Sequence, residues 1–502
     1  MRSLPCAVFV AILISLPLAA AEHRDVGLTQ KGVLIEASVV PGPNASAPTV
    51  LLVGGLAGND ESARAVSREV EAFDAIPQNR RPIRLLAIPL ANPDGVKLQF
   101  PPTGVAYREN SESHAVWRWI GIHAPDLVLV AGDQDFGLTA ALTQNSVAQV
   151  APIPARHVDA KPGILSSVAK DIPASEAHRE LERRRSRSPK QLADELAQIY
   201  GHNFDQITYI PGLALIARLR LGDTADIVRL AEPYANGSKD SLGRPSSLVL
   251  AGHLVFGELA QRTGDARYVQ LVRKAAAFGF TDSGEMKDAM PFHGEMSDSV
   301  FMDFSILAKA GKVTGEKKYF DMAARHLAFM EKLVHRPDGL FRHSPLTDAA
   351  WGRGNAFPAI GFALALSDFP KDHPDFNHIL QSYQRYMAKL AQFQNEDGLW
   401  REVVDHPGSY PEFTATAMIG FAMLRGIKNG WIDSRTYQPI VDKAWQAVLS
   451  RSGPNGVFLD VSESTNKQPT LDDYIHRAAI LDRDQRAGAM ALMFATEMGN
   501  LR

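Results

Sequence analysis

An aspartate just ahead of an apolar helical segment is the side chain in this sequence best suited to proton transfer. Val300 and Phe304 follow Asp298 at a spacing that gives a helix one buried face. A carboxyl group at the buried start of a helix is partly desolvated, which raises its pKa and favours proton donation. The same position also suits a residue that caps the helix and complements its dipole. The pattern leaves both roles open for Asp298.

Two further clusters of polar and aromatic residues stand ahead of apolar helical segments. They are Trp351-Gly-Arg-Gly-Asn355 and Glu412-Phe-Thr-Ala-Thr416. Arg353 carries a planar fork that suits bidentate pairing with a carboxylate, although a structural ion pair would use the same fork. Trp351 offers a flat aromatic face, or an ordinary core side chain. The clusters would bring polar and aromatic side chains together at one place in the fold.

Turns of one kind recur through the second half of the chain and divide it into helical hairpins. They lie at Asp338-Gly-Leu-Phe341, Asp397-Gly-Leu-Trp400 and Asn455-Gly-Val-Phe458, roughly 55–60 residues apart by count. Repeated helical hairpins stack into a solenoid or close into a ring. The length suits about six hairpins, so we expect an all-α, six-hairpin (α/α)6 toroid. The polar clusters would then meet at the mouth of the ring, where the inner helices begin.

Strand-like and helix-like segments alternate in the first half of the chain. Apolar strands are predicted at 49–53, 84–90 and 126–130, with helices at 61–73 and 112–122 between them. Continuous apolar strands separated by helices indicate an α/β domain with a mostly parallel sheet covered on both faces. We therefore expect a multidomain protein with an α/β N-terminal domain and a helical C-terminal domain.

The expected division of the chain follows from these patterns and from its termini. Residues 1–21 combine Arg2, a short apolar run and small residues before Glu22, the pattern of a cleaved signal peptide too short to span a membrane. We expect the α/β domain at 22–165, a charged linker at 166–198 and the toroid at 199–502.

The composition narrows the possible partners. The 502 residues carry a net charge of −3 and 45% are hydrophobic, which is typical of a globular protein and argues against nucleic acid as a partner. Cys6, the single cysteine, lies in the predicted signal peptide. We therefore expect an exported protein, periplasmic or secreted, without thiolate metal sites. We expect neither a metal nor a cofactor, and the sequence leaves the oligomeric state open.

The motifs of the second half resemble those of a known enzyme group. Asp298-Ser-Val-Phe-Met302, Trp351-Gly-Arg-Gly-Asn355 and Glu412-Phe-Thr-Ala-Thr-Ala417 are similar, in the same order, to motifs of the unsaturated uronyl hydrolases, glycoside hydrolase families 88 and 105. The resemblance implies a six-hairpin toroid that removes unsaturated (4,5-dehydro) uronic acid from lyase-generated oligosaccharides. It implies hydration of the C4=C5 double bond, with Asp298 as the catalytic proton donor.

The resemblance also implies roles for residues around this aspartate. We expect an acidic oligosaccharide substrate to bind residues that are polar or aromatic and lie in or near the motifs: Trp351, Arg353, Asn355, His343, His293 and Glu412. His343 would bond a sugar hydroxyl, although a lone histidine is often structural. One departure stands out, because the family carries a second Asp shortly before the position of Gly252, whereas Ser246-Ser247 contributes no acid here.

A second resemblance concerns the first half. Gly54-Gly-Leu-Ala-Gly-Asn-Asp60, Asn92-Pro-Asp-Gly95 and Asp126-Leu-Val-Leu-Val-Ala-Gly132 are similar to segments of the zinc carboxypeptidases and their deacylase relatives. The family's zinc ligands would fall at Ala57, Asp60 and Gly132, which lack the two histidines. A catalytic zinc needs about three protein ligands. The resemblance therefore implies a degenerate, non-peptidase domain.

Two alternatives to the unsaturated uronyl hydrolase remain open from the sequence. A toroid glycosidase acting on saturated uronides would need a further carboxylate near the mouth, for which Glu412, Glu295 and Asp348 are candidates. An inactive carbohydrate-binding or scaffold protein would bind saccharides without turnover.

Overall fold

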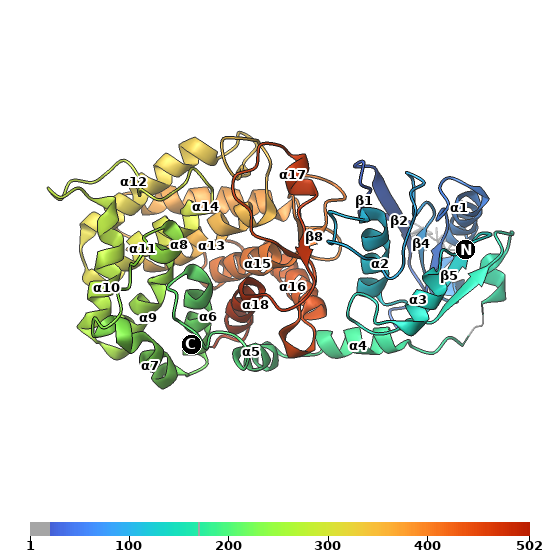
Figure 1. The fold of residues 1–502 in the computed structure, drawn as a ribbon, viewed down its shortest axis with the longest axis horizontal. Helices are drawn as coiled ribbons and strands as arrows, with labels where there is room; N and C mark the ends of the chain where they lie inside the picture. The colour runs from blue at the N-terminus through green and yellow to red at the C-terminus, as the bar shows by residue number, and fades with distance from the viewer. Residues whose placement is uncertain (1–20, 169–170, 502) are drawn as a thin grey trace, which may run out of the picture.

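The computed structural model describes residues 21–168 and 171–501. The predicted signal peptide therefore lies outside the described residues, apart from Ala21. The described chain forms an α/β lobe and a larger helical lobe, with one helix running between them (Figure 1). This helix is α4 (Glu176–Arg185). None of the described helices is long and apolar enough to cross a membrane.

The N-terminal lobe is built on a six-stranded sheet of order β1-β2-β4-β3-β5-β6. Strands β4, β3, β5 and β6 pair in parallel, while β1 and β2 add an antiparallel edge. The strands are β1 (Glu22–Leu28), β2 (Leu34–Val40), β3 (Thr49–Val53), β4 (Arg84–Ile88), β5 (Leu127–Ala131) and β6 (Ala155–Val158). The predicted mostly parallel sheet is confirmed.

Helices cover both faces of this sheet, because its central strands are apolar at every position after Thr49 in β3 and Arg84 in β4. Val50 and Leu52 of β3 face a core shared with α1 (Glu61–Asp74), whereas Leu51 and Val53 face the core shared with α2 (Ser111–His123). A third helix, α3 (Leu138–Gln144), joins the α2 side. Complete burial on alternating faces explains the absence of polar alternation in these strands.

The helical lobe is a closed double ring, as the hairpin repeat predicts. Neighbouring inner helices contact each other around the full circle, and each packs against an outer helix. The inner layer comprises α6 (Tyr209–Arg220), the pair α8 (Ser247–Gly252) and α9 (Leu254–Thr263), α11 (Ser299–Thr314), α13 (Gly352–Asp368), α15 (Phe413–Lys428) and α18 (Gln485–Met498). The outer layer comprises α5 (Pro189–Ala197), α7 (Thr224–Ala235), α10 (Ala266–Ala276), α12 (Lys317–Val334), α14 (Phe376–Ala391) and α16 (Ser434–Arg451).

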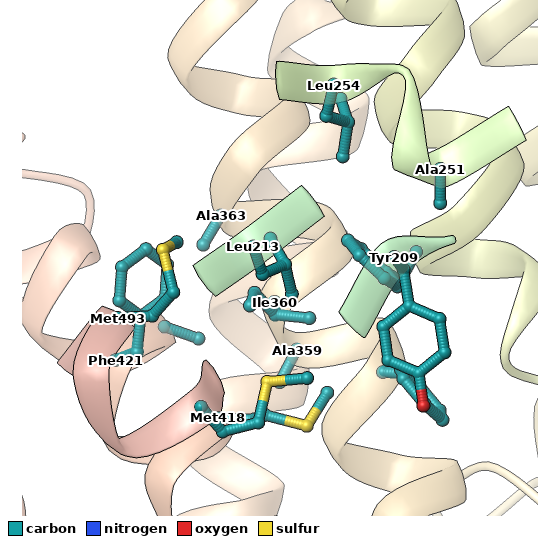
Figure 2. Packing of buried hydrophobic residues seen from close by; sticks show 14 of the residues in the cluster. Tyr209, Leu213, Ala251, Leu254, Ala359, Ile360, Ala363, Met418, Phe421 and Met493 are labelled. Atoms are coloured by element: carbon teal, nitrogen blue, oxygen red, sulfur yellow. The ribbon is translucent and has the colours of Figure 1, made fainter. Parts of the chain in front are cut away.

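Apolar side chains from all the inner helices fill the centre of the ring. Tyr209, Leu213, Ile360, Met418 and Met493 converge there from four helices (Figure 2). The inner helices are therefore apolar around much of their circumference, as expected for helices buried on every side. Polar residues of these helices therefore gather at the two ends of the ring.

Helices α11 and α13 approach each other closely at a glycine. A Cβ atom on Gly361 would lie 2.3 Å from the carbonyl oxygen of Val300. Only glycine permits this contact. This contact places the start of α11 against the middle of α13. Nearer the mouth, Ser297 Oγ donates to the carbonyl of Gly354 at 2.6 Å, which joins the segment of Asp298 to the start of α13.

The segment predicted as a charged linker contains α4 and α5. Arg184 of α4 is buried and donates to the carbonyl of Ser450 at 3.2 Å. Leu192 and Leu196 of α5 join the core of the helical ring. Buried residues of this segment, both charged and apolar, thus attach it to the ring.

The two lobes meet through a buried polar contact at Asp460. The Asp460 carboxylate pairs with Arg118 of α2 at 2.5 Å and accepts a hydrogen bond from Tyr107 Oη at 3.0 Å. The Tyr107 ring also stacks on Tyr410 of the helical lobe, with 4.5 Å between centroids. Asp460 immediately precedes the short strand β9 (Val461–Ser462), which reaches the mouth of the ring. The N-terminal lobe therefore contacts a segment that borders the predicted site.

Candidate active site

A cavity of about 430 Å³ lies at the mouth of the ring. Its wall is formed by the starts of α6, α8, α11 and α13 and by the loop after β9. The lining includes Asp298, His293, Trp351 and Arg353 from the predicted set. The structure thus brings together side chains from segments far apart in the chain, as the toroid expectation requires.

The Asp298 carboxyl does not cap its helix. It makes no hydrogen bond to the backbone amides of the first turn of α11. Its Oδ1 atom is buried without a hydrogen-bond partner among the described residues, although His343 Nε2 lies 3.4 Å away. The side chain is 16% exposed. The carboxyl therefore does not serve as a helix cap, and it borders the cavity. A group that transfers a proton to a ligand needs this access.

His343 lies behind Asp298 in a fully buried position. Its Nδ1 atom is 2.7 Å from Tyr474 Oη, which also accepts a hydrogen bond from the Gln468 amide at 3.1 Å. Burial raises the pKa of Tyr474 to about 12, so this phenol keeps its proton. When the phenol donates to Nδ1, the remaining proton of a neutral His343 sits on Nε2 and points at Asp298. The geometry gives His343 a positioning role toward the aspartate.

Arg353 is 2% exposed and is held by neutral oxygen atoms. Nη1 donates to the carbonyl of Ser462 at 2.8 Å and to Thr414 Oγ1 at 3.3 Å, and Nη2 donates to the carbonyl of Glu463 at 2.9 Å. No carboxylate of the described residues forms an ion pair with it. A buried guanidinium without a direct counter-ion, bordering a cavity, favours an anionic ligand.

Trp351 forms part of the wall and lies against this guanidinium, with 4.8 Å from the Arg353 Cζ atom to the ring. Its indole Nε1 donates to Glu402 Oε1 at 2.8 Å. Burial, and then the nearby Glu412, raise the pKa of Glu402 well above its usual range. The ring is thereby fixed by a hydrogen bond on the side away from the cavity.

Asn355 and Glu412 do not line the cavity. The Asn355 side chain accepts from the Phe341 amide at 2.9 Å and donates to the Phe341 carbonyl at 2.8 Å. Glu412 caps α15 through the Thr414 amide at 3.0 Å and also accepts from the Ser462 amide at 3.0 Å. Both side chains stabilise the wall, and neither reaches the space that a ligand would occupy.

His293 borders the cavity from the loop before α11. Its Nδ1 atom accepts a hydrogen bond from the Glu295 amide at 2.9 Å, so Nε2 carries the proton of the neutral ring. Burial lowers the pKa of His293. His293 therefore offers one hydrogen-bond donor at the rim.

Several lining residues were not predicted from the sequence. Arg477 brings a second guanidinium, whose Nε atom is buried without a partner among the described residues. The other unpredicted polar residues that line the cavity are Tyr209, Ser246, Ser247, Ser299, Ser464, Thr465, Asn466 and Gln468. Arg477 and the residues from 464 to 468 come from a loop that no helical period predicts. The sequence signal for this loop is its position after the last of the recurring turns, Asn455-Gly-Val-Phe458, on the side of the ring where the mouth is expected.

A second cavity, of about 380 Å³, lies around the carboxyl ends of the inner helices. Its charged residues neutralise each other: Lys309 pairs with Glu258 at 2.8 Å and with Asp368 at 3.0 Å, and Arg425 pairs with Glu497 at 2.6 Å. These groups stabilise the ring and leave no free acid–base group comparable to Asp298.

The fold and the cavity define a helical toroid in which Asp298 is the one carboxyl, among the described residues, that lines the mouth cavity. Comparison with known proteins identifies the family of this toroid. The model of Glycosyl Hydrolase Family 88 matches residues 248–501, and the chain belongs to this family. The matched region includes every predicted site residue.

Two curated relatives have similar sequences. The Unsaturated 3S-rhamnoglycuronyl hydrolase of Alteromonas sp. (strain LOR) is 28% identical over 172 residues, which cover 32% of this chain and 42% of that protein. The Unsaturated rhamnogalacturonyl hydrolase YesR of Bacillus subtilis (strain 168) is 27% identical over 186 residues, which cover 36% of this chain and 52% of that protein. The chain thus matches about half the length of these relatives.

Solved structures show the same fold. A glycoside hydrolase from family 105 of C. acetobutylicum ATCC 824 gives a TM-score of 0.54 at 18% identity, covering 62% of this chain and 99% of that one. A glycosyl hydrolase of family 88 from Bacteroides vulgatus gives 0.53 at 14% identity, covering 63% and 100%. The predicted (α/α)6 toroid is therefore confirmed.

Proposed function

We propose that this protein removes a terminal 4,5-unsaturated uronic acid from lyase-generated oligosaccharides by hydrating the C4=C5 double bond. One observation carries the proposal: Asp298 is the single carboxyl among the described residues that line the cavity. Glycosidases that act directly at the anomeric carbon use a pair of carboxyl groups across the bond. A cavity with one acid and two guanidinium groups suits hydration of an unsaturated uronate better.

The proposed reaction uses Asp298 first as an acid and then as a base. The protonated carboxyl gives its proton to C4, and positive charge develops at C5 and the ring oxygen. Water adds to C5, and the Asp298 carboxylate takes the proton that the water releases. The resulting hemiketal opens and frees the remaining saccharide, so that one water is consumed and Asp298 returns to its starting state.

The guanidinium groups account for recognition of the substrate carboxylate. Arg353 and Arg477 border the cavity from opposite parts of the chain, one at the start of α13 and the other after α17 (Asp472–Ile475). Arg477 also pairs with Glu463 at 3.2 Å and donates to the carbonyl of Ser464, so its Nε atom, which has no hydrogen-bond partner among the described residues, is the donor left for a ligand. Charge-assisted pairing with a carboxylate would hold the sugar with its double bond toward Asp298.

The structure gives little support to the first alternative, hydrolysis of saturated uronides. Of its three candidate carboxylates, Glu412 caps α15, Glu295 pairs with Lys467 at 2.8 Å and Asp348 pairs with Arg342 at 2.9 Å. None of the three lines the cavity.

The test follows the ultraviolet absorbance of the double bond conjugated to its carboxylate, which hydration destroys. Lyase digests of pectin, rhamnogalacturonan, ulvan and glycosaminoglycans are added to the full chain. We expect absorbance to fall with at least one digest, and to persist with Asp298→Asn. The exposed Asp348→Asn serves as a matched control that keeps its activity. Release of a saturated uronic acid, or tight saccharide binding without turnover, would contradict the proposal.

We further infer that the N-terminal lobe is a non-peptidase domain that braces the toroid. At the positions of the zinc ligands implied by resemblance, Asp60 accepts hydrogen bonds from the Ser62 and Ala63 amides as the cap of α1. Arg108 of this lobe pairs with Glu463 of the other lobe. No cluster of three or more His, Cys, Asp or Glu within residues 21–168 and 171–501 is arranged to hold a metal.

Export remains a proposal that the sequence of residues 1–21 supports. Expression in a bacterial host, followed by fractionation and amino-terminal sequencing, tests it. A mature chain that begins near Glu22 outside the cytoplasm is expected. An uncleaved cytoplasmic chain would contradict it.

A further inference from the structure

A second carboxyl lies behind the cavity wall, at Asp303 of α11. Asp303 is fully buried. Its Oδ2 atom is 2.7 Å from Ser247 Oγ and also accepts a short hydrogen bond from Ser299 Oγ. Ser247 and Ser299 both line the cavity, whereas Asp303 does not. The carboxyl therefore contacts the site only through two serine hydroxyls.

The hydrogen bonds around Ser299 can be assigned one proton at a time. The amide of Met290 donates to His326 Nδ1 at 3.2 Å, so the proton of neutral His326 sits on Nε2. That Nε2 atom faces Ser299, at 3.1 Å from Oγ and 3.3 Å from the carbonyl oxygen. Because His326 is a donor there, the Ser299 hydroxyl must give its own proton to Asp303.

The two contacts of the Ser247 hydroxyl indicate that Asp303 is protonated. Its hydroxyl lies 2.7 Å from the carbonyl oxygen of Phe292 and 2.7 Å from Asp303 Oδ2. A serine has one proton, and an ionised carboxylate and a carbonyl both only accept. Both contacts carry a proton only if Ser247 donates to Phe292 and Asp303 Oδ2 donates to Ser247. The Oδ1 atom of Asp303 is buried without a partner among the described residues, which also disfavours the charged form.

We propose that Asp303 is a neutral positioning residue of the active site, which turns the hydroxyls of Ser247 and Ser299 into a pair of hydrogen-bond acceptors for a substrate hydroxyl. In this arrangement both serine protons point away from the cavity, so each oxygen presents a lone pair to it. The inference rests on the proposed function for the identity of the ligand, a sugar. The arrangement itself depends only on the contacts of Asp303.

The same geometry explains the departure seen at Ser246-Ser247. The short helix α8 carries a serine where an acid was expected, and the carboxyl of Asp303 stands 2.7 Å behind that serine. The acid thus enters the site from α11 instead of α8. Moving the carboxyl back to α8 becomes a direct test of its role.

The experiment compares Asp303→Asn, Asp303→Ala and the double variant Asp303→Ala with Ser247→Asp, using the full chain and the digest that the wild type consumes. Asparagine preserves the volume but cannot both accept from Ser299 and donate to Ser247 through one atom. We expect kcat/KM to fall about 10- to 100-fold in both single variants, mainly through KM, since a ground-state contact is lost. The double variant should recover about tenfold over Asp303→Ala, because its carboxylate supplies the acceptor directly.

Ser305→Ala is the matched control. Ser305 lies on the same helix, and its hydroxyl is buried without a partner among the described residues. Its removal should leave kcat and KM unchanged. Asp303→Asn with kinetic constants within twofold of wild type, or a loss in kcat alone, would overturn the inference while leaving the proposed function intact.

A spectroscopic measurement tests the arrangement without any substrate. Infrared difference spectra of the wild type and Asp303→Asn at about pH 5 should show the carbonyl stretch of one protonated carboxyl in the wild type alone. His326 reaches Asp303 through Ser299 and is present in both proteins of this comparison. The absence of the band would overturn the inference, even if no digest is consumed. If the band is present and every digest remains intact, the proposed function fails while the positioning arrangement stands.

Discussion

The contact between the lobes makes a quantitative prediction at Tyr107. Its hydroxyl donates to the buried Asp460 carboxylate at 3.0 Å, while its ring stacks on Tyr410. Tyr107→Phe removes the hydroxyl and leaves the ring stack in place. Hydrogen bonds to charged groups contribute about 1.5–3 kcal/mol. Asp460 keeps Arg118 at 2.5 Å, so the full cost of an unpaired buried charge is avoided. We expect the free energy of unfolding to fall by about 1.5–3 kcal/mol.

Tyr410→Phe provides the control for this experiment. It removes a hydroxyl from the same ring stack, and the hydrogen bond of that hydroxyl to the carbonyl of Ala478 is long, at 3.4 Å. Its cost should stay below about 1 kcal/mol. Urea denaturation followed by circular dichroism measures both variants. Equal stabilities for the two variants would refute the reasoning that the Asp460 contact stabilises the toroid.

Two further perturbations test the site. Burial raises the pKa of Asp303 to about 6, above the usual value of 3.8. The native state therefore binds this proton more tightly than the unfolded state, and the stability it contributes is lost as pH rises through 6. Between about pH 4 and pH 7 the wild type should lose about 2 kcal/mol relative to Asp303→Asn in urea denaturation, and a pH-independent difference would contradict the shift. Arg353→Lys keeps the charge but loses the fork that spans the carbonyls of Ser462 and Glu463, so KM for the unsaturated substrate should rise at least about tenfold, and an unchanged KM would remove Arg353 from carboxylate binding.

Local patterns predicted the elements of the fold well. The strand at 49–53 and the helix at 61–73 correspond to β3 and α1, because continuous apolar runs and helical periods reflect burial that the sequence records locally. The antiparallel edge formed by β1 and β2 was not predicted. Its pairing with β4 joins Val39 to Leu86, a long-range contact that no local pattern encodes.

The site was predicted in part, for a similar reason. Asp298, Trp351 and Arg353 stand at the starts of inner helices, so the ring alone brings them to the mouth. Whether Asp298 caps α11 depended on its side-chain conformation, which only the structure reveals. In the sequence, Asp303 is an ordinary position of the helix after Asp298. Its contact with Ser247 is visible only in the structure, where α8 packs against α11.

The most direct test of the central claim is the rate at which the full-length Asp298→Asn variant consumes the unsaturated oligosaccharide that the wild type consumes. Loss of a general acid costs about 10²–10⁴-fold in rate. The melting temperature should remain unchanged, because Oδ1 of Asp298 has no hydrogen-bond partner among the described residues. We predict a folded variant whose rate of absorbance loss is at least about 100-fold lower. A folded variant with a rate within a few-fold of wild type would contradict the account.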